Sequence, residues 1–91
     1  MGIAIPHVKI PQVSDYVIAV GRSRQGIEFN ALDGRPVQLI FMIAASHEQT
    51  REFVKILRDV TLLLKCGQVR EQLLQAQVPQ EFYRIIQERL A

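Results

Sequence analysis

The feature that most constrains the fold is an apolar stretch of nine residues in the middle of the chain, 37–45. It reads Val-Gln-Leu-Ile-Phe-Met-Ile-Ala-Ala, and Gln38 is its one polar residue. A half-buried surface strand alternates polar with apolar residues, whereas a strand that is apolar on both faces belongs inside a sheet that is covered on both sides. The pair Asp33-Gly34 ahead of it is a strong turn signal. The stretch therefore predicts a central strand.

Further strands are expected ahead of this stretch. Pro6 ends the first apolar segment, because proline has no N–H to give to a ladder. Gly26 separates two segments that are rich in strand-forming residues. The expected segments are strands at 2–5, 16–22 and 27–29, and a loop at 8–15.

The second half of the chain predicts three helices. Ser46 and Gln49 have the spacing of a capping box, which places the start of a long helix at Ser46. Apolar residues then recur every three or four positions, as on a helix that buries one face. These residues are Phe53, Ile56, Leu57, Val60, Leu63 and Leu64. Lys65 lies in the last turn, and Gly67 is placed to end the helix.

Two shorter helices are expected after Gly67. The second spans about 68–75 with Val69 and Leu73 inward, and the third begins at Pro79, which suits a first helical turn. Together these elements predict the α/β class, with a mixed β-sheet in the N-terminal half covered by three C-terminal helices. A length of 91 residues fits one domain over 1–91.

Composition and charge exclude several classes of protein. Apolar residues make up 48% and charged residues 22%, which is typical of a folded globular domain. The 11 basic and 9 acidic residues are dispersed, so no basic stripe marks a nucleic-acid surface. The longest wholly apolar run, 39–45, is too short to span a membrane, and the N-terminus lacks the charged segment of a signal peptide. We therefore expect a cytoplasmic protein that neither binds nucleic acid nor inserts into a membrane.

The single cysteine, Cys66, favours a packed thiol over a reactive one, since its neighbours are Leu63, Leu64 and Val69. Cys66 and the two histidines, His7 and His47, are too few ligands for a zinc site. No Gly-rich phosphate loop and no catalytic triad order occurs in the chain. We therefore expect no metal and no organic cofactor.

His7 is the candidate for chemistry, because it follows a strand and a proline on an expected loop. A histidine with an ordinary pKa near 6.5 is largely neutral at cytoplasmic pH, so its ring can act as a nucleophile. On spacing alone, a hydrogen-bonded surface histidine is the commoner case. His47, in the first turn of the expected helix, reads as a solvated residue.

The hexapeptide Gly-Ile-Ala-Ile-Pro-His at 2–7 resembles the signature of type-2 EIIA domains. These are the fructose, mannitol and nitrogen-regulatory EIIA proteins of the bacterial phosphoenolpyruvate-dependent phosphotransferase system. The resemblance continues in order over nearly the whole chain, through the turn and strand at 32–43, Glu48-Gln49-Thr50, the helical ladder after it, and the segments 73–77 and 81–86.

The resemblance implies that His7 accepts a phosphoryl group from the carrier HPr and passes it to an EIIB domain. Phosphoryl transfer of this kind is mostly positioning and electrostatics, so no cofactor is implied. The start of the long helix, near Ser46 and His47, would offer backbone N–H groups to the phosphoryl oxygens. The sugar or the regulatory pathway cannot be read from these residues.

Three departures from the family pattern favour an alternative, a catalytically inactive phosphotransferase-like regulatory or interaction module. The hexapeptide usually lies well inside a longer domain, so the chain reads as an N-terminally shortened domain or as part of a longer protein. Val8 stands where a small residue is usual, and Phe53 stands where many members have a second histidine. A shortened domain would leave one face of the central strand bare, and we expect a homodimer to cover it.

Overall fold

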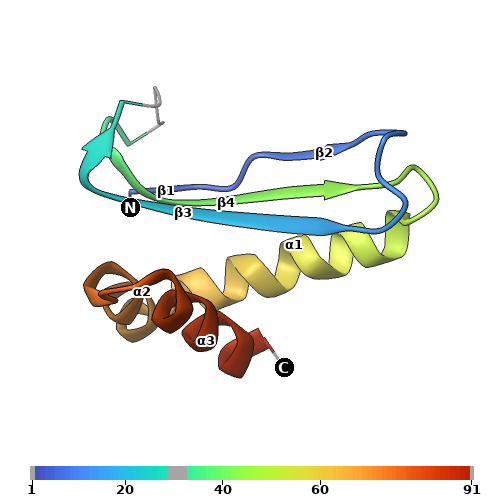
Figure 1. The fold of residues 1–91 in the computed structure, drawn as a ribbon. Coiled ribbons are helices and arrows are strands. Elements are labelled where there is room, and N and C mark those ends of the chain that lie inside the picture. Colours follow the sequence, from blue (N-terminus) through green and yellow to red (C-terminus); the bar gives the residue numbers. More distant parts are fainter. Residues whose placement is uncertain (1, 29–32, 91) are drawn as a thin grey trace. The chain divides into compact units, whose positions relative to one another are not determined.

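The computed structural model describes residues 2–28 and 33–90 (Figure 1). Two compact units divide the chain, Met1–Lys55 and Ile56–Ala91, and their boundary falls within the first helix. The elements are β1 (Ile3–Ala4), β2 (His7–Lys9), β3 (Val17–Ile27), β4 (Val37–Ala45), α1 (Thr50–Lys65), α2 (Gly67–Gln75) and α3 (Pro79–Leu90). The predicted mixed sheet in the N-terminal half, followed by three helices, is confirmed. A single domain over 1–91, with the helices covering the sheet, stays a prediction.

β4 is the central strand of the first unit, as the apolar stretch predicts. β1 and β2 pair with it in parallel and β3 pairs with it antiparallel (Figure 1). Ile3 pairs with Leu39 and His7 pairs with Ile43, so one register runs through β1 and β2. These two short strands therefore lie end to end along one edge of β4, and β3 occupies the other edge.

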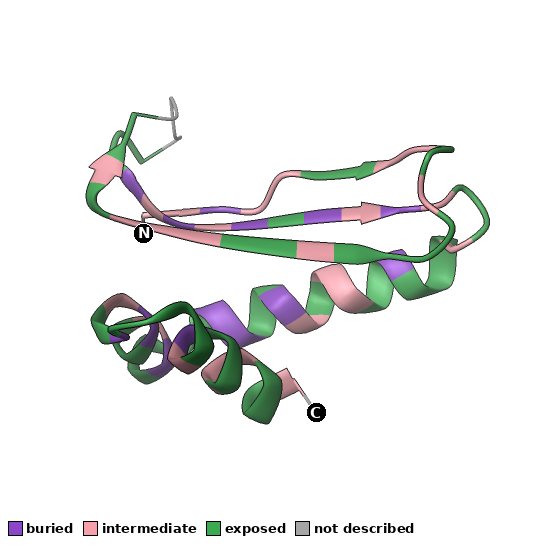
Figure 2. Ribbon diagram, viewed as in Figure 1, coloured by how far each residue is buried: buried purple, intermediate pink, exposed green. Residues whose placement is uncertain are grey.

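The two faces of β4 differ in burial. Its odd-numbered residues from Val37 to Ala45 are all buried, and the residues between them are half-buried or exposed (Figure 2). Met42 is the most open of these, with 51% of its surface exposed. Within this chain only the odd-numbered face of β4 is buried, so the expectation that one face of the central strand is left bare holds for the described residues.

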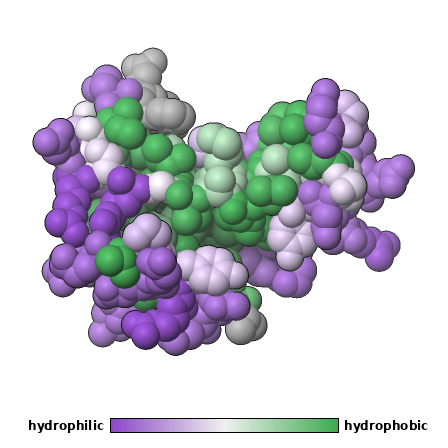
Figure 3. Space-filling view, in the orientation of Figure 1, coloured by the Kyte–Doolittle hydropathy of each residue, from purple (hydrophilic) through white to green (hydrophobic). Residues whose placement is uncertain are grey.

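The other face of β4 continues onto its neighbours. Residues paired across a ladder share a face, so Val8 and Val17 join Ala44 there, and Ala19 joins Met42. Val8 and Val17 are about half exposed. We call the residues of this surface, of which only Ala4 is buried, the open face: Ala4, Val8, Val17, Ala19, Gly21, Gln38, Ile40, Met42 and Ala44. None of them carries a charge. Figure 3 shows hydrophobic side chains gathered on part of the surface.

β3 is one strand where the sequence predicts two. Its ladder with β4 is irregular between Arg22 and Ile27, and the backbone N–H of Gly26 donates to the Ser23 hydroxyl at 3.2 Å. Gly26 has a φ of +86°, and a Cβ there would lie 2.5 Å from Cβ of Pro36. Glycine therefore bends the strand without ending it. The predicted strand at 27–29 reaches beyond the described residues at Phe29.

The predicted turn at Asp33-Gly34 is present. Gly34 has a φ of +72°, a backbone conformation that residues with a Cβ rarely adopt. The Asp33 carboxylate accepts a hydrogen bond from the backbone N–H of Arg35 at 3.0 Å, as in an Asx turn.

α1 begins three residues later than the capping-box spacing predicts, since that spacing makes Ser46 the N-cap. The backbone N–H of Phe53 donates to the Gln49 carbonyl at 2.8 Å, so Gln49, and not Ser46, precedes the helix. Ser46 and Gln49 still contact each other, because the Ser46 N–H and hydroxyl both lie within hydrogen-bond distance of the Gln49 side-chain oxygen, at 3.1 and 3.2 Å. The capping residues therefore stabilise the turn that leads into the helix.

Gly67 and Cys66 also differ from expectation. Gly67 is the first residue of α2 and has no positive φ, so it does not end α1. The guanidinium of Arg70 instead donates to the Leu64 carbonyl at 2.5 Å and satisfies an orphan acceptor of the last turn. Cys66 is the N-cap of α2 and is exposed, so the expectation of a packed thiol is wrong. A hydrogen bond from the backbone N–H of Val69 is the main cause that lowers the pKa of the Cys66 thiol.

The second unit buries most of the residues that the helical spacing indicates, whereas Ile56 and Leu57 are only half-buried. Val60 and Leu64 on α1 are almost fully buried, as are Val69 and Leu73 on α2. α3 begins at Pro79 as predicted, and Phe82 is its buried residue. None of the described helices is long and apolar enough to cross a membrane.

A matched pair of leucines on α1 tests this burial. Leu64 is 2% exposed and Leu62 is 56% exposed. We expect Leu64→Ala to lower the free energy of unfolding by about 2–5 kcal/mol, because it removes buried methyl groups and leaves a cavity. Leu62→Ala should change it by about 0.5 kcal/mol or less. Urea unfolding followed by circular dichroism measures both, and equal losses would show that the buried side of α1 is misassigned.

Candidate functional site

His7 lies in a strand and not on a loop, contrary to the sequence prediction. It is the first residue of β2 and pairs with Ile43 of β4. β1 ends before Pro6, as predicted, and the Pro6 carbonyl accepts a hydrogen bond from the backbone N–H of Ile43 at 2.9 Å, so pairing with β4 resumes at His7. His7 is therefore held by the central strand, and its side chain is exposed.

The hydrogen bond of the His7 ring defines its reactive atom. Nδ1 lies 2.7 Å from the backbone carbonyl oxygen of Ile5. A carbonyl can only accept, so Nδ1 carries the proton and donates it. In the neutral ring the lone pair then resides on Nε2. The geometry therefore presents Nε2 of an exposed histidine as a nucleophile.

The first turns of α1 lie beside β2. The rings of His7 and Phe53 are 5.8 Å apart between centroids and tilted by 49°, which is an ordinary aromatic packing distance. Nζ of Lys9 lies 6.0 Å from the centroid of the same Phe53 ring and 3.5 Å from the hydroxyl oxygen of Thr50. The structure thus brings His7, Lys9, Thr50 and Phe53 together, all within the first unit.

Val8 does not crowd this group. Successive side chains of a strand point to opposite faces, so Val8 projects to the open face, while His7 and Lys9 share the other face. A β-branched residue also favours the extended backbone of β2. The presence of Val8 is therefore compatible with access to the His7 ring.

Ser46 and His47, the predicted phosphate-supporting residues, lie in the connection between β4 and α1. Ser46 follows Ala45, which pairs with Lys9 at the far end of β2 from His7. The Ser46 hydroxyl is engaged with the Gln49 side chain, and His47 is exposed. Their role in holding a phosphoryl group stays a prediction.

The loop before β3 is also joined to the turn before α1. The Gln49 side-chain amide donates to the Asp15 carboxylate at 2.6 Å, which ties the loop before β3 to the turn before α1. This hydrogen bond is the main cause that lowers the pKa of Asp15, and the backbone N–H of Tyr16 lowers it further. Asp15 therefore remains ionised near neutral pH and keeps both connections in place.

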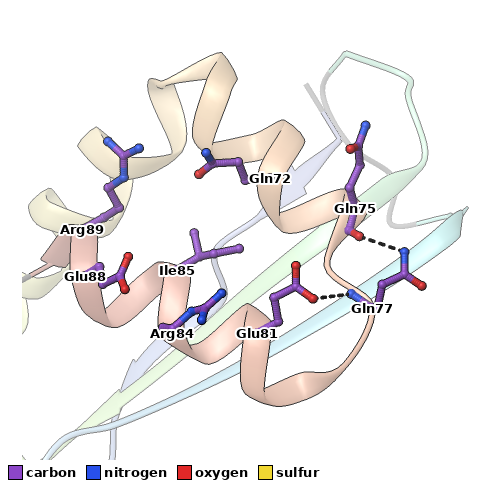
Figure 4. A pocket seen from close by; sticks show the side chains of 8 residues that line it. All are labelled: Gln72, Gln75, Gln77, Glu81, Arg84, Ile85, Glu88 and Arg89. Atoms are coloured by element: carbon purple, nitrogen blue, oxygen red, sulfur yellow. Dashed lines mark hydrogen bonds between the residues drawn. The ribbon is translucent and has the colours of Figure 1, made fainter.

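A pocket of about 650 Å³ lies within the second unit (Figure 4). It is polar, and its wall includes a hydrogen bond from the backbone N–H of Gln77 to Glu81 at 3.1 Å. Its lining comes from α2, α3 and the connection between them: Gln72, Gln75, Gln77, Glu81, Arg84, Ile85, Glu88 and Arg89. None of the predicted site residues lines it. Over residues 2–28 and 33–90, no cluster of three metal-ligating side chains occurs.

Lys9 and Thr50 are the residues that sequence reasoning missed. With 8–15 read as a loop, nothing relates Lys9 to His7. Read as strand, the same residues place positions 7 and 9 on one face, which is the signal that would have found Lys9. No local sequence pattern could show that Lys9 contacts Thr50 and Phe53, because these residues lie far from it in the chain.

Comparison with known proteins gives a family match over almost the entire chain. The model of the family described as "Phosphoenolpyruvate-dependent sugar phosphotransferase system, EIIA 2" matches residues 1–89. The crystal structure of the nitrogen regulatory protein IIA-Ntr from Neisseria meningitidis superposes with a TM-score of 0.88 and 30% identity. The match covers 94% of this chain and 59% of that one.

Curated relatives come from fructose and nitrogen systems. The fructose-specific EIIABC component of Bacillus subtilis is 42% identical over 76 residues, 84% of this chain and 12% of that protein. The fructose-specific EIIA component of Haloferax volcanii is 37% identical over 87 residues, 96% of this chain and 56% of that protein. A nitrogen regulatory protein of Pseudomonas aeruginosa is 33% identical over 85 residues, 93% of this chain and 55% of that protein. The chain thus spans little more than half the length of these single-component relatives.

The protonation state of the His7 ring can be measured directly. We expect the neutral ring to carry its proton on Nδ1, because the Ile5 carbonyl lies within hydrogen-bond distance of that atom. Long-range ¹H–¹⁵N NMR above the imidazole pKa distinguishes the two nitrogens, and the exposed ring of His47 serves as the internal control. A His7 ring protonated on Nε2 would contradict the assignment of the nucleophilic atom.

Proposed function

Because the chain belongs to the type-2 EIIA family of the phosphoenolpyruvate-dependent sugar phosphotransferase system, we propose that it is a phosphohistidine carrier. His7 accepts a phosphoryl group from HPr and passes it to an EIIB domain. The role is sugar uptake or nitrogen-type regulation, since the relatives include fructose-specific and nitrogen regulatory proteins. Such a relay operates in the cytoplasm.

The observation that carries the proposal is the unprotonated Nε2 of an exposed ring. The contact between Nδ1 and the Ile5 carbonyl fixes both the tautomer and the ring orientation before any donor arrives. Packing against Phe53 restricts the ring further. Positioning of this kind supplies much of the catalysis in phosphoryl transfer, where side chains do little covalent work.

The transfer step is an in-line displacement. The lone pair of Nε2 attacks phosphorus, a new P–N bond forms, and the bond between phosphorus and the donor's histidine nitrogen breaks. Its electron pair stays on the donor ring. The Nδ1 proton remains in place, so the phosphorylated His7 ring is cationic and donates to the Ile5 carbonyl. The reverse sequence transfers the phosphoryl group to EIIB. Neither direction needs a metal or an organic cofactor.

The competing function is a phosphotransferase-like regulatory or interaction module in which His7 is inactive. One observation favours it: the ring packed against that of His7 belongs to Phe53, which offers no hydrogen bond to a phosphoryl group. In that case the hexapeptide would serve the fold alone. The two functions differ in a single measurable property, the acceptance of a phosphoryl group.

Reconstitution of the relay separates them. On incubation with phosphoenolpyruvate, enzyme I and HPr, we expect intact-protein mass spectrometry to show one added phosphoryl group that is labile in acid and stable in base. His7→Ala should abolish it, because Nε2 is the acceptor, while the matched control His47→Ala should retain it. Label that persists in His7→Ala, or is lost only in His47→Ala, would contradict the assignment. No label on the wild-type chain would support the inactive module.

We further propose that a second copy of the chain covers the open face. This face combines half-exposed apolar residues such as Val17 and Met42 with a complete lack of charged residues. Two copies related by a two-fold axis bring the same surface together. An uncharged surface can do so without like-charge repulsion, and burial of its apolar area drives the association. A separate polypeptide that covers the same face is the alternative.

Sedimentation equilibrium at micromolar concentration tests this association. We expect the wild-type chain to sediment as a dimer that dissociates on dilution. Met42→Lys should shift it to the monomer, because it places a charge in the middle of the open face. The control Tyr83→Lys, at a residue of α3 that is 62% exposed, should leave the dimer intact. A wild-type chain that is monomeric and folded at all concentrations would contradict the proposal.

A further inference from the structure

We propose that Lys9 is a catalytic residue of the phosphoryl transfer, with its ammonium group binding the oxygens of the phosphoryl group at Nε2 of His7. The inference rests on the proposed function of His7 and adds to it the cation that the transferred group requires. Neither the family match nor the names of the relatives assign a role to this lysine.

The strand places the two side chains side by side. His7 and Lys9 are the first and last residues of β2, so both project to the same face. Their Cα atoms are therefore about 7 Å apart along the strand, at about 3.3 Å per residue. A lysine side chain is long and flexible, and its ammonium group offers three donors. A phosphoryl group on Nε2 extends from the His7 ring and lies within reach of such a side chain.

The contacts of α1 keep Lys9 near the His7 ring. The Phe53 ring is 5.8 Å from the His7 ring and 6.0 Å from Nζ of Lys9, so both groups share one aromatic neighbour. Contact with Phe53 holds the lysine by a weak cation–π attraction. Nζ also lies 3.5 Å from the Thr50 hydroxyl, at the long limit of a hydrogen bond. The ammonium group is thus held loosely and can exchange the hydroxyl for a phosphoryl oxygen at little cost.

A phosphoryl group on Nε2 of His7 would be stabilised by a nearby cation. A phosphoryl group carries nearly two negative charges near neutral pH. Phe53 provides no hydrogen bond, and the Ser46 hydroxyl is engaged with Gln49. Of Lys9, Thr50 and Phe53, which the structure places beside one another near the ring, Lys9 carries a positive charge. It would stabilise the charge on the equatorial oxygens while the P–N bonds form and break.

The test uses potassium phosphoramidate as the phosphoryl donor, because a small donor requires no protein docking surface. Nε2 attacks phosphorus, the bond to the donor nitrogen breaks, and ammonia leaves. We compare the wild-type chain with Lys9→Met, which keeps the length and removes the charge, and with Lys9→Arg, which keeps a charge. Lys65→Met is the matched control, at an exposed lysine in the last turn of α1.

We expect Lys9→Met to lower the second-order rate of His7 phosphorylation about tenfold, less than the loss of a buried oxyanion donor because the site is open to water. Lys9→Arg should recover most of the rate, and Lys65→Met should match the wild type. The second readout is the ³¹P NMR titration of the phosphorylated chain. Without the ammonium group, the phosphoryl pKa should rise, because the dianion loses its cationic partner.

A Lys9→Met chain that reacts at the wild-type rate and titrates like the wild type would overturn the inference. A rate that falls equally in Lys9→Met and Lys9→Arg, with an unchanged ³¹P titration, would also overturn it, since it would indicate a structural effect. Labelling by phosphoramidate that depends on Lys9, together with no labelling by HPr, would refute the proposed donor and leave the role of Lys9 standing. If neither donor labels His7, both proposals fail.

Discussion

The first unit depends on the hydrogen-bond ladder of β4, which is paired along both of its edges. The three other strands of the sheet all pair with β4. β1 and β2 together provide five residues to its ladder, too few to form a stable sheet by themselves. The position of His7 therefore depends on β4. His7 pairs with Ile43, and the backbone N–H of Ile43 donates a hydrogen bond to the Pro6 carbonyl.

Elements that are specified locally could be predicted from the sequence. β4 is a long run of strand-forming apolar residues, and its bounds are those predicted. α3 has its start defined by Pro79, whose missing N–H is harmless in the first turn. The turn at Asp33-Gly34 is likewise encoded by the residues that form it. In each case the signal lies in the residues of the element itself.

Elements that depend on a partner could not be predicted in this way. β2 is a strand because β4 lies beside it, and no pattern within three residues can show that. α1 begins at Thr50 because Gln49 uses its carbonyl for the helix and its side chain for Asp15, a residue far away in the sequence. Cys66 is exposed although its sequence neighbours are apolar, since the chain passes there from one helix to the next. The candidate site follows the same division: the hexapeptide indicates His7, whereas Phe53 contacts the His7 ring only through the tertiary fold. Lys9 shares a face with His7 only because β4 makes this segment a strand.

The shared register of β1 and β2 also limits which changes of length the hexapeptide can accept. Ile3 and His7 are both paired with β4, so the segment between them has a fixed span. An insertion or deletion of one residue there, with Ile3 still paired, would turn the His7 ring to the opposite face of the sheet and away from Phe53. Substitutions within the segment preserve this geometry as long as its length is kept. A functional chain can therefore vary more readily in the composition of this segment than in its number of residues.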